Sequence, residues 1–294
     1  MFDNNIKIHF AGSDGEIIFH YALLAANVKY MLYSCYKYVV NADKDTDLLL
    51  AEDDIIKVQD RKMRHVIQDS GLFTLMFGAG KGQEITKERL IKWQDNLIRF
   101  VMANDLHATC VEIDCQKVLG VKEAWFFRER MKKLLPNRQI NVFHLEDGKD
   151  GLDSLIDFSD YIAISVPELR IHKKGTYKQD TIRLAHYIKN RKPDIDIHLL
   201  GCTQFDILKD LTFCTSADST SWLQGVKYGF ISDGNQKKHV RQFDRNIFNQ
   251  RRAQMLSLMG EREMKECTLA YTVNASISAS IYKQRYTQVA GGQN

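Results

Sequence analysis

Proline and long apolar runs are both scarce in this chain. Only three of its 294 residues are proline, while 44% are hydrophobic and 27% are charged. These proportions exclude a collagen-like protein and are not those of a disordered chain. A chain of this length forms either two small domains or one large domain. We expect a globular protein with a substantial core.

The sequence has no segment typical of a signal peptide or of a membrane span. The first ten residues, MFDNNIKIHF, lack a basic start followed by a long apolar region. The longest uncharged stretch, Cys267–Tyr282, is rich in Thr, Ser and Asn. It is too short and too polar to cross a bilayer. We therefore expect a cytoplasmic protein.

The six cysteines form no redox or zinc-binding pattern. No C-x-x-C pair occurs, and no Cys/His spacing is of the zinc-finger kind. In a cytoplasmic chain we expect reduced thiols and no structural zinc. The cysteines are Cys35, Cys110, Cys115, Cys202, Cys214 and Cys267.

Positive charge is concentrated in two segments, although the net charge of the chain is only +4. Arg170–Arg191 contains seven Lys or Arg residues and one Asp. Asp233–Arg252 contains six Lys or Arg residues and two Asp. Such segments form either a face that binds a polyanion or simply solvated helix surfaces. Both interpretations stand at this point.

Short apolar runs alternate with amphipathic segments along most of the chain. The strands that we expect are Lys7–Ala11, Val28–Ser34, His65–Gln68, Ala108–Asp114, Ile140–His144, Tyr161–Val166, Ile195–Leu200 and Leu211–Ser216. The clearest helices are Lys87–Ala103, Lys122–Leu135, Gln179–Asn190 and Gln204–Lys209. Eight such units predict an α/β fold, a (β/α)₈ TIM barrel with parallel strands.

The pattern changes after Trp222, and the last part of the chain no longer alternates. Lys237–Glu266 is typical of one or two basic helices. We expect a catalytic barrel at residues 1–230 and a C-terminal helical extension at residues 231–294, packed on the barrel and without a zinc subdomain.

Carboxylates follow several of the predicted strands. Asp14, Asp69, Asp114, Glu168 and Asp218 all stand near a predicted strand end, where a barrel carries its catalytic groups. An Asp at such a position more often caps the next helix than catalyses a reaction. Several carboxylates at one mouth would nevertheless raise the pKa of one of them and leave a proton donor beside a nucleophile. Glycosidic-bond chemistry uses such a pair.

Five segments of the chain carry the motifs of one enzyme family in that family's order. Val66–Phe73 reads VIQDSGLF and is similar to an Asp-Ser-Gly-Gly-Phe motif. The others are Val111–Cys115, Tyr161–Ser165, His198–Gly201 and Ser216–Trp222. Over about residues 6 to 230 the chain thus resembles the tRNA-guanine transglycosylase superfamily. Its Ala-Asp-Ser-Thr-Ser-Trp ending is most similar to the DNA-modifying branch, the DpdA-like proteins that insert 7-deazaguanines into phage or bacterial DNA.

The resemblance implies a pentosyltransferase that exchanges a base in an intact polynucleotide. It implies that Asp218 is the nucleophile that attacks C1′ of a guanine nucleotide, and that Asp69 is the general acid and base. It implies that Asp114 binds the purine edge, where a carboxylate accepts from N1–H and the amine. The other implied base-binding residues are Ser70, Gly71, Phe73, His144, Ser165 and Gly201. The co-substrate would be a free 7-deazaguanine base such as preQ0, with no other cofactor and no metal.

Three departures from the family pattern bear on the substrate. Leu72 replaces the second Gly of the motif, and Ser165 stands near the position of a Gly pair. Only Cys267 follows Asp218, so the three-Cys-plus-His zinc site of the tRNA enzymes is missing from this sequence. That site helps to hold tRNA, so we expect DNA as the substrate. A tRNA enzyme and a non-catalytic nucleic-acid-binding homologue remain alternatives, and the oligomeric state stays open.

A polynucleotide substrate gives the two basic segments a role in phosphate binding beside the base pocket. Tyr177, Trp222 and Phe230 are candidate stacking partners for bases. The segment Gly78–Gly82 lacks the spacing of a phosphate-binding loop and predicts a glycine loop over the pocket. For a phage-encoded chain the location would be the host cytoplasm. The residues that we expect to contact nucleic acid are Arg170, Lys173, Lys174, Lys237, Lys238, Arg241 and Arg245.

Overall fold

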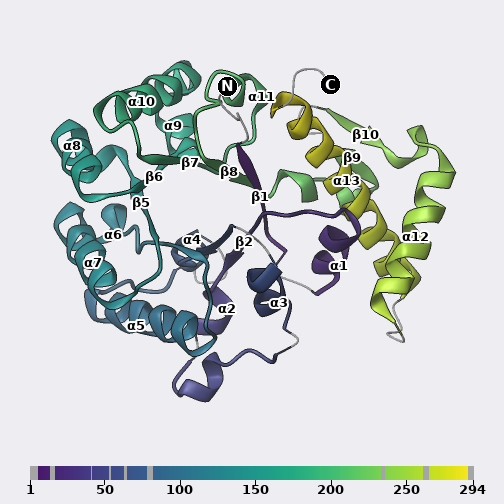
Figure 1. Cartoon of the computed structure of the whole chain (residues 1–294), viewed down its shortest axis with the longest axis horizontal. Helices are drawn as coiled ribbons and strands as arrows, with labels where there is room; N and C mark the ends of the chain where they lie inside the picture. Colours follow the sequence, from purple (N-terminus) through teal and green to yellow (C-terminus); the bar gives the residue numbers. More distant parts are fainter. Residues whose placement is uncertain are drawn as a thin grey trace. The chain divides into compact units, whose positions relative to one another are not determined.

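Eight parallel strands form a closed barrel, and helices lie between successive strands (Figure 1). The predicted (β/α)₈ barrel is therefore confirmed. The computed structural model describes residues 6–13, 17–40, 42–52, 54–62, 65–77, 82–232, 236–260 and 265–290. Asp14 and most of the predicted glycine loop, at residues 78–81, lie outside the described residues.

The barrel strands follow one another in chain order. They are β1 Lys7–Ala11, β2 Met31–Ser34, β3 Val66–Asp69, β4 Thr109–Val111, β5 Gln139–Phe143, β6 Tyr161–Ser165, β7 Asp196–Leu200 and β8 Ser216–Ser219. Seven of them share most of their residues with the predicted strands, and β8 shares only Ser216. The prediction of the eighth strand at Leu211–Ser216 was wrong, because β8 begins at Ser216, where that residue pairs with Lys7 of β1. The preceding apolar residues form a turn closed by Cys214 N–H donating to Leu211 O.

The helices between the barrel strands vary from one turn to more than four turns. They are α1 Ile17–Ala25, α2 Tyr36–Val39, α3 Ile55–Lys62, α4 Leu72–Phe77, α5 Lys87–Ala103, α6 Gln116–Leu119, α7 Val121–Leu134, α8 Gly148–Phe158, α9 Val166–His172, α10 Tyr177–Arg191 and α11 Phe205–Leu208. Helix α5 shows why the sequence predicts these elements well. Thr86 caps it by accepting from Arg89 N–H, and its apolar face, which includes Leu90, Trp93 and Leu97, is buried.

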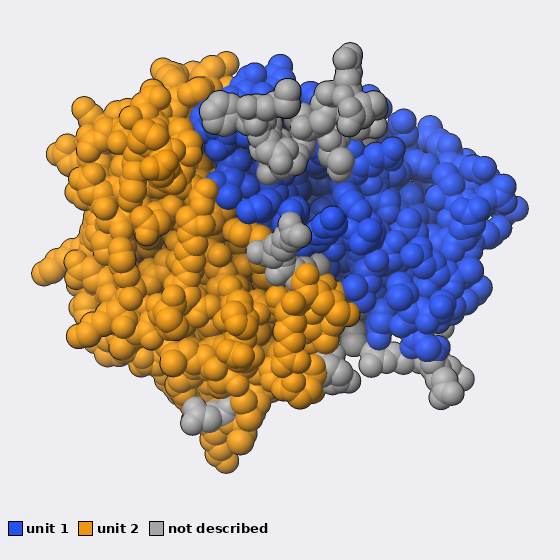
Figure 2. Space-filling view, viewed as in Figure 1, with its two compact units in different colours: residues 1–31, 201–294 blue, residues 32–200 orange. Residues whose placement is uncertain are grey.

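Two compact units make up the chain, and Figure 2 colours them separately. Unit 1 consists of residues 1–31 and 201–294, and unit 2 consists of residues 32–200. The predicted domain boundary after residue 230 stays a prediction, because the segments next to it on both sides belong to unit 1.

Unit 1 joins the first elements of the chain to a helical C-terminal extension. The extension contains α12 Arg245–Met259 and α13 Glu266–Ala290, and both pack against α1. The prediction of helices throughout Lys237–Glu266 was partly wrong, because β10 (Lys237–His239) pairs with β9 (Phe230–Ser232) as an antiparallel hairpin. No helix among the described residues is long and apolar enough to span a membrane.

Candidate active site

Asp69 is the last residue of β3 and stabilises the turn that follows it. Its Oδ2 atom accepts a hydrogen bond of 2.9 Å from Gly71 N–H. Gly71 has φ +77°, and a Cβ atom there would lie 2.8 Å from the backbone nitrogen of Tyr36. Only glycine fits this turn without strain. Asp69 thus has the structural role that the sequence left open beside catalysis. The same hydrogen bond holds its carboxylate at the end of the strand.

Asp218 lies within β8, and not after it as the sequence predicted. Its side chain is buried, and its Oδ1 atom accepts a hydrogen bond of 2.7 Å from Gly201 N–H, directly after β7. His9 of β1 is its register partner and is fully buried. The Gly201 bond comes from the end of another strand, so it ties β8 to the connection after β7. Asp218 and Gly201 belong to unit 1, whereas Asp69 belongs to unit 2.

His144 joins two carboxylates of unit 2 that follow different strands. Its Nε2 atom lies 3.2 Å from Asp114 Oδ2, after β4, and its Nδ1 atom lies 2.8 Å from Glu168 Oε2, in the first turn of α9. Lys117 Nζ lies 3.2 Å from the other oxygen of Glu168. His144 and Glu168 are buried, and the Asp114 side chain is 18% exposed. The four side chains form a chain of alternating charge that ends on the partly exposed Asp114.

Both histidine nitrogens face carboxylates, so the geometry favours an imidazolium. Burial alone would lower the pKa of His144, but the hydrogen bonds and charges of Asp114 and Glu168 outweigh it and raise the pKa to about 10. For Glu168, burial acts in the opposite direction and would raise the pKa, but His144 and Lys117 lower it to about 2. The two shifts agree, so His144 is a cation and Glu168 an anion at neutral pH.

A second ion-pair network lies beneath these residues in unit 2. Arg128 of α7 donates through Nε to both oxygens of Glu112, at 3.0 and 2.8 Å, and through Nη1 to Asp147 at 3.4 Å. Asn141 Nδ2 and Val142 N–H also donate to Glu112. Burial raises the pKa of Glu112, yet four donated bonds on its two oxygens fit a carboxylate, and we take the pair as ionised.

Asp147 connects the two networks. Its Oδ2 atom accepts from the backbone N–H of His144 at 3.0 Å and from Gln116 Nε2 at 3.2 Å. The turn that carries His144 is therefore fixed by a buried carboxylate, which Arg128 in turn holds. Arg128 also donates to the backbone oxygen of Val142, at the end of β5. Arg128 thus anchors both Glu112, two positions before Asp114, and, through Asp147, the backbone of His144.

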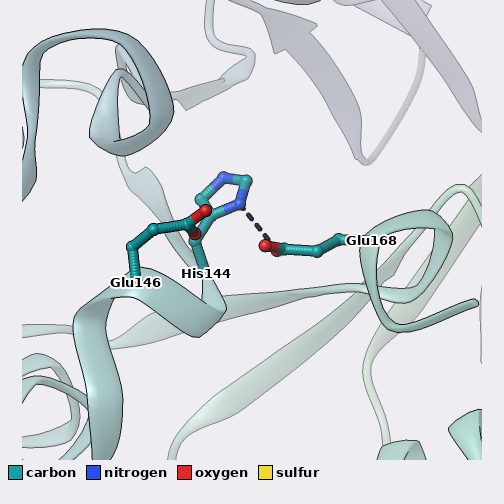
Figure 3. Close-up of side chains that lie close together, drawn as sticks. All are labelled: His144, Glu146 and Glu168. Carbon is teal, nitrogen blue, oxygen red and sulfur yellow. Dashed lines mark hydrogen bonds and ion pairs between the residues drawn. The ribbon is translucent and has the colours of Figure 1, made fainter. Parts of the chain in front are cut away.

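The same region contains three possible metal ligands, and Figure 3 shows them. Ligand atoms of His144, Glu146 and Glu168 all lie within 4.8 Å of one another, with Glu146 exposed. To bind His144, a metal ion would have to displace a proton from an imidazole whose pKa is about 10. It would also have to break the hydrogen bond between that imidazole and a carboxylate. The ion-pair arrangement therefore accounts better for these residues than a metal centre does.

The other predicted base-binding residues occupy two kinds of environment. Ser70 is buried, and its backbone oxygen accepts from Trp93 Nε1 at 2.8 Å. Ser165 is buried at the end of β6. Phe73, in contrast, is 68% exposed, while the neighbouring Leu72 is fully buried in unit 2. The large residue that replaces the motif glycine thus contributes to the core.

The predicted nucleic-acid contacts are exposed, but part of each basic segment is used within the fold. Arg251 Nη1 donates to Ala25 O and to Ser276 Oγ, and Arg252 pairs with Glu266. Arg183 pairs with Asp180. Arg251 and Arg252 thus link α12 to α13, whereas the Arg183 pair lies within α10. The exposed residues are Arg170, Lys173 and Lys174 in unit 2, and Lys237, Lys238, Arg241 and Arg245 in unit 1.

The sequence placed Glu168 near a strand end without a specific role, and it did not single out Lys117 or Arg128. One signal for Arg128 was available in the spacing, because Arg128 falls on the same helical face as Ala124, Phe127 and Met131. In the structure all four are buried. A charged residue on such a face needs a buried partner. No comparable signal marked Lys117.

No family model and no curated protein matches the chain. The resemblance to the tRNA-guanine transglycosylase superfamily therefore stays a prediction from the five sequence motifs.

Proposed function

We propose that this protein is a DNA-guanine transglycosylase that exchanges guanine for a 7-deazaguanine base. The observation that carries the proposal is the position of the two motif aspartates. Asp69 ends β3 and Asp218 lies in β8 of one closed parallel barrel. Barrel enzymes carry their catalytic groups at the carboxyl ends of the strands.

The proposed reaction has two displacements at C1′ of the nucleotide. The Asp218 carboxylate attacks C1′, and the bond from C1′ to N9 breaks with its electron pair passing to guanine, which takes a proton from Asp69. The incoming 7-deazaguanine then loses its N9 proton to Asp69. Its N9 atom attacks C1′, and the ester bond to Asp218 breaks. Two inversions give net retention, as in retaining glycosidases.

Asp114 is the proposed acceptor for the guanine edge. A guanine-like base presents N1–H and an amine side by side, and both are donors. His144 fixes Asp114 through Oδ2, and the partial exposure of Asp114 leaves it accessible. Adenine has an acceptor at N1 in place of the N1–H donor, so its edge fits a carboxylate poorly.

The test is incorporation of a radiolabelled 7-deazaguanine into DNA by the full chain. Asp218→Asn keeps an oxygen for the Gly201 bond but removes the nucleophile, so exchange should fall by at least about 10³-fold. The wild type should leave a protein–DNA adduct on denaturing gels, and the variant should leave none. Asp157→Asn, an exposed aspartate of α8, is the matched control and should retain both.

Parallel reactions with DNA and tRNA separate the alternatives. Incorporation into DNA supports the proposal, and incorporation confined to tRNA would overturn the choice of substrate. Binding without exchange on either polynucleotide would mean a non-catalytic homologue. Full activity of Asp218→Asn would refute the mechanism.

A further inference from the structure

The hairpin of β9 and β10 is firmly anchored in unit 1. Ile231 and Ser232 of β9 are buried, and Ser278 Oγ of α13 donates to Ser232 O at 3.3 Å. The hairpin lies beside α13 (Figure 1). Before it, Val226 is fully buried in the short turn Val226–Tyr228. The backbone of this region is therefore held on its inner side.

The outer side presents aromatic rings to solvent. Tyr228 is 68% exposed and Phe230 is 37% exposed. Lys227 Nζ lies 4.9 Å from the centroid of the Tyr228 ring, and the Phe230 ring meets His239 edge-on at 5.2 Å. A large exposed ring on an anchored backbone contributes little to the core. Its exposure instead suits stacking against a planar partner.

Within the described residues 221–232 and 236–243, every Asp, Glu, Lys or Arg is a cation. Lys227, Lys237, Lys238 and Arg241 are exposed. Residues 221–232 and 236–243 include no Asp or Glu. We call Lys227, Tyr228, Phe230, Lys237, Lys238 and Arg241 the aromatic–basic surface.

We propose that the aromatic–basic surface binds single-stranded polynucleotide, with a base stacked on Tyr228 and phosphates on the neighbouring cations. Sites of this kind combine aromatic platforms with cations that follow the backbone. A lipid surface instead needs a continuous apolar helix face, and the side chains here belong to a short turn and a two-stranded hairpin. The inference rests on the proposed function in one respect, because a base can be exchanged only when it leaves the duplex stack.

The test is fluorescence anisotropy of the full chain with a short labelled single-stranded oligonucleotide over a range of salt concentrations. Tyr228→Ala should weaken binding about tenfold at every salt concentration, because one stacked base is lost. Tyr228→Phe should bind like the wild type. Lys237→Gln combined with Lys238→Gln should reduce the slope of log K against log salt by about 1.4.

The matched control is Phe126→Ala in unit 2. Phe126 is 37% exposed, as Phe230 is, and like Tyr228 it has a lysine over its ring, with Lys87 Nζ 4.3 Å from the centroid. Its replacement should leave binding unchanged. Equal losses in Phe126→Ala and Tyr228→Ala would overturn the proposal, because exposed aromatic residues in general would then be responsible.

Three further results would overturn it. The first is binding of the oligonucleotide by Tyr228→Ala at the wild-type level. The second is a loss of binding to inorganic polyphosphate by Tyr228→Ala that equals its loss on the oligonucleotide. The third is a loss by Tyr228→Ala that is seen only on phosphatidylserine vesicles. Because binding is measured without catalysis, the two proposals fail separately. Binding that depends on Tyr228 without base exchange would refute the proposed function alone, and exchange with binding indifferent to Tyr228 would refute this inference alone.

Discussion

His144 shows how a single residue takes its charge from its neighbours. A lone histidine near a strand end is most often a satisfied core residue, and the sequence offered no reason to expect a cation. Asp114 and Glu168, each from a different βα connection, accept from its two nitrogens. Its pKa is therefore raised to about 10 although the side chain is buried. Asp114 in turn gains a fixed orientation for the proposed base.

The His144 network should give the protein a defined stability window in pH. The pKa of His144 is raised from 6.5, so its contribution is complete below about pH 6.5 and is lost as the pH rises through about 10. The pKa of Glu168 is lowered from 4.5, so its contribution is complete above about pH 4.5 and is lost as the pH falls towards 2. His144→Gln should cost on the order of 3 kcal/mol near pH 6 and clearly less near pH 10.

Urea denaturation of wild type and His144→Gln across this range measures the difference in unfolding free energy. The exposed His172→Gln is the control and should show no such trend. A constant difference from about pH 6 to about pH 10 would contradict a charged His144.

Helix α7 shows how an element can serve its neighbours through one side chain. Arg128 reaches from the helix to Glu112, after β4, to Val142 O of β5 and to Asp147. Glu112 lies two positions before Asp114, and Val142 lies two positions before His144. The amphipathic pattern predicted the helix, because it depends on residues a turn apart. The partners of Arg128 depended on strands brought close by the barrel.

Loss of Arg128 should destabilise the protein strongly. Arg128→Met leaves two buried carboxylates without their cation and should cost about 3 to 5 kcal/mol in the free energy of unfolding. Adding Glu112→Gln and Asp147→Asn should recover part of that loss, because no buried charge then remains unpaired. Arg130→Met, which removes a half-buried pair with Asp95, should cost no more than about 1 kcal/mol. Equal costs for Arg128→Met and Arg130→Met in urea denaturation would disprove this role.

At the scale of the whole molecule, unit 1 is assembled from both ends of the sequence. Buried residues from α1, β9, α12 and α13 form one cluster, which includes Ala25, Ile231, Met255 and Ile277. Arg251 adds a bond to Ala25 O across 226 positions of the chain. The C-terminal extension is therefore part of the core of unit 1, and its arginines are partly consumed by that packing.

Truncation of a cluster side chain should show this dependence. Ile277→Ala should lower the free energy of unfolding by about 2 to 4 kcal/mol, because Ile277 is 2% exposed in the cluster. Leu258→Ala removes a comparable side chain of α12 that is 43% exposed, and it should cost less than about 1 kcal/mol. Thermal or urea denaturation compares the two. Equal costs would show that the packing of α13 does not stabilise unit 1.

The sequence by itself determined the alternation of strands and helices, the barrel that follows from it, and the positions of Asp69 and Asp218 near strand ends. These features depend on side-chain periodicity within a few residues. Tertiary structure alone decided that β8 starts at Ser216, that Arg251 is a structural residue, and that His144 is charged. Glu112 and Arg128 are 16 positions apart and His144 and Glu168 are 24 apart. Bonds at such separations exist only because parallel strands bring distant loops together, and no local pattern encodes them.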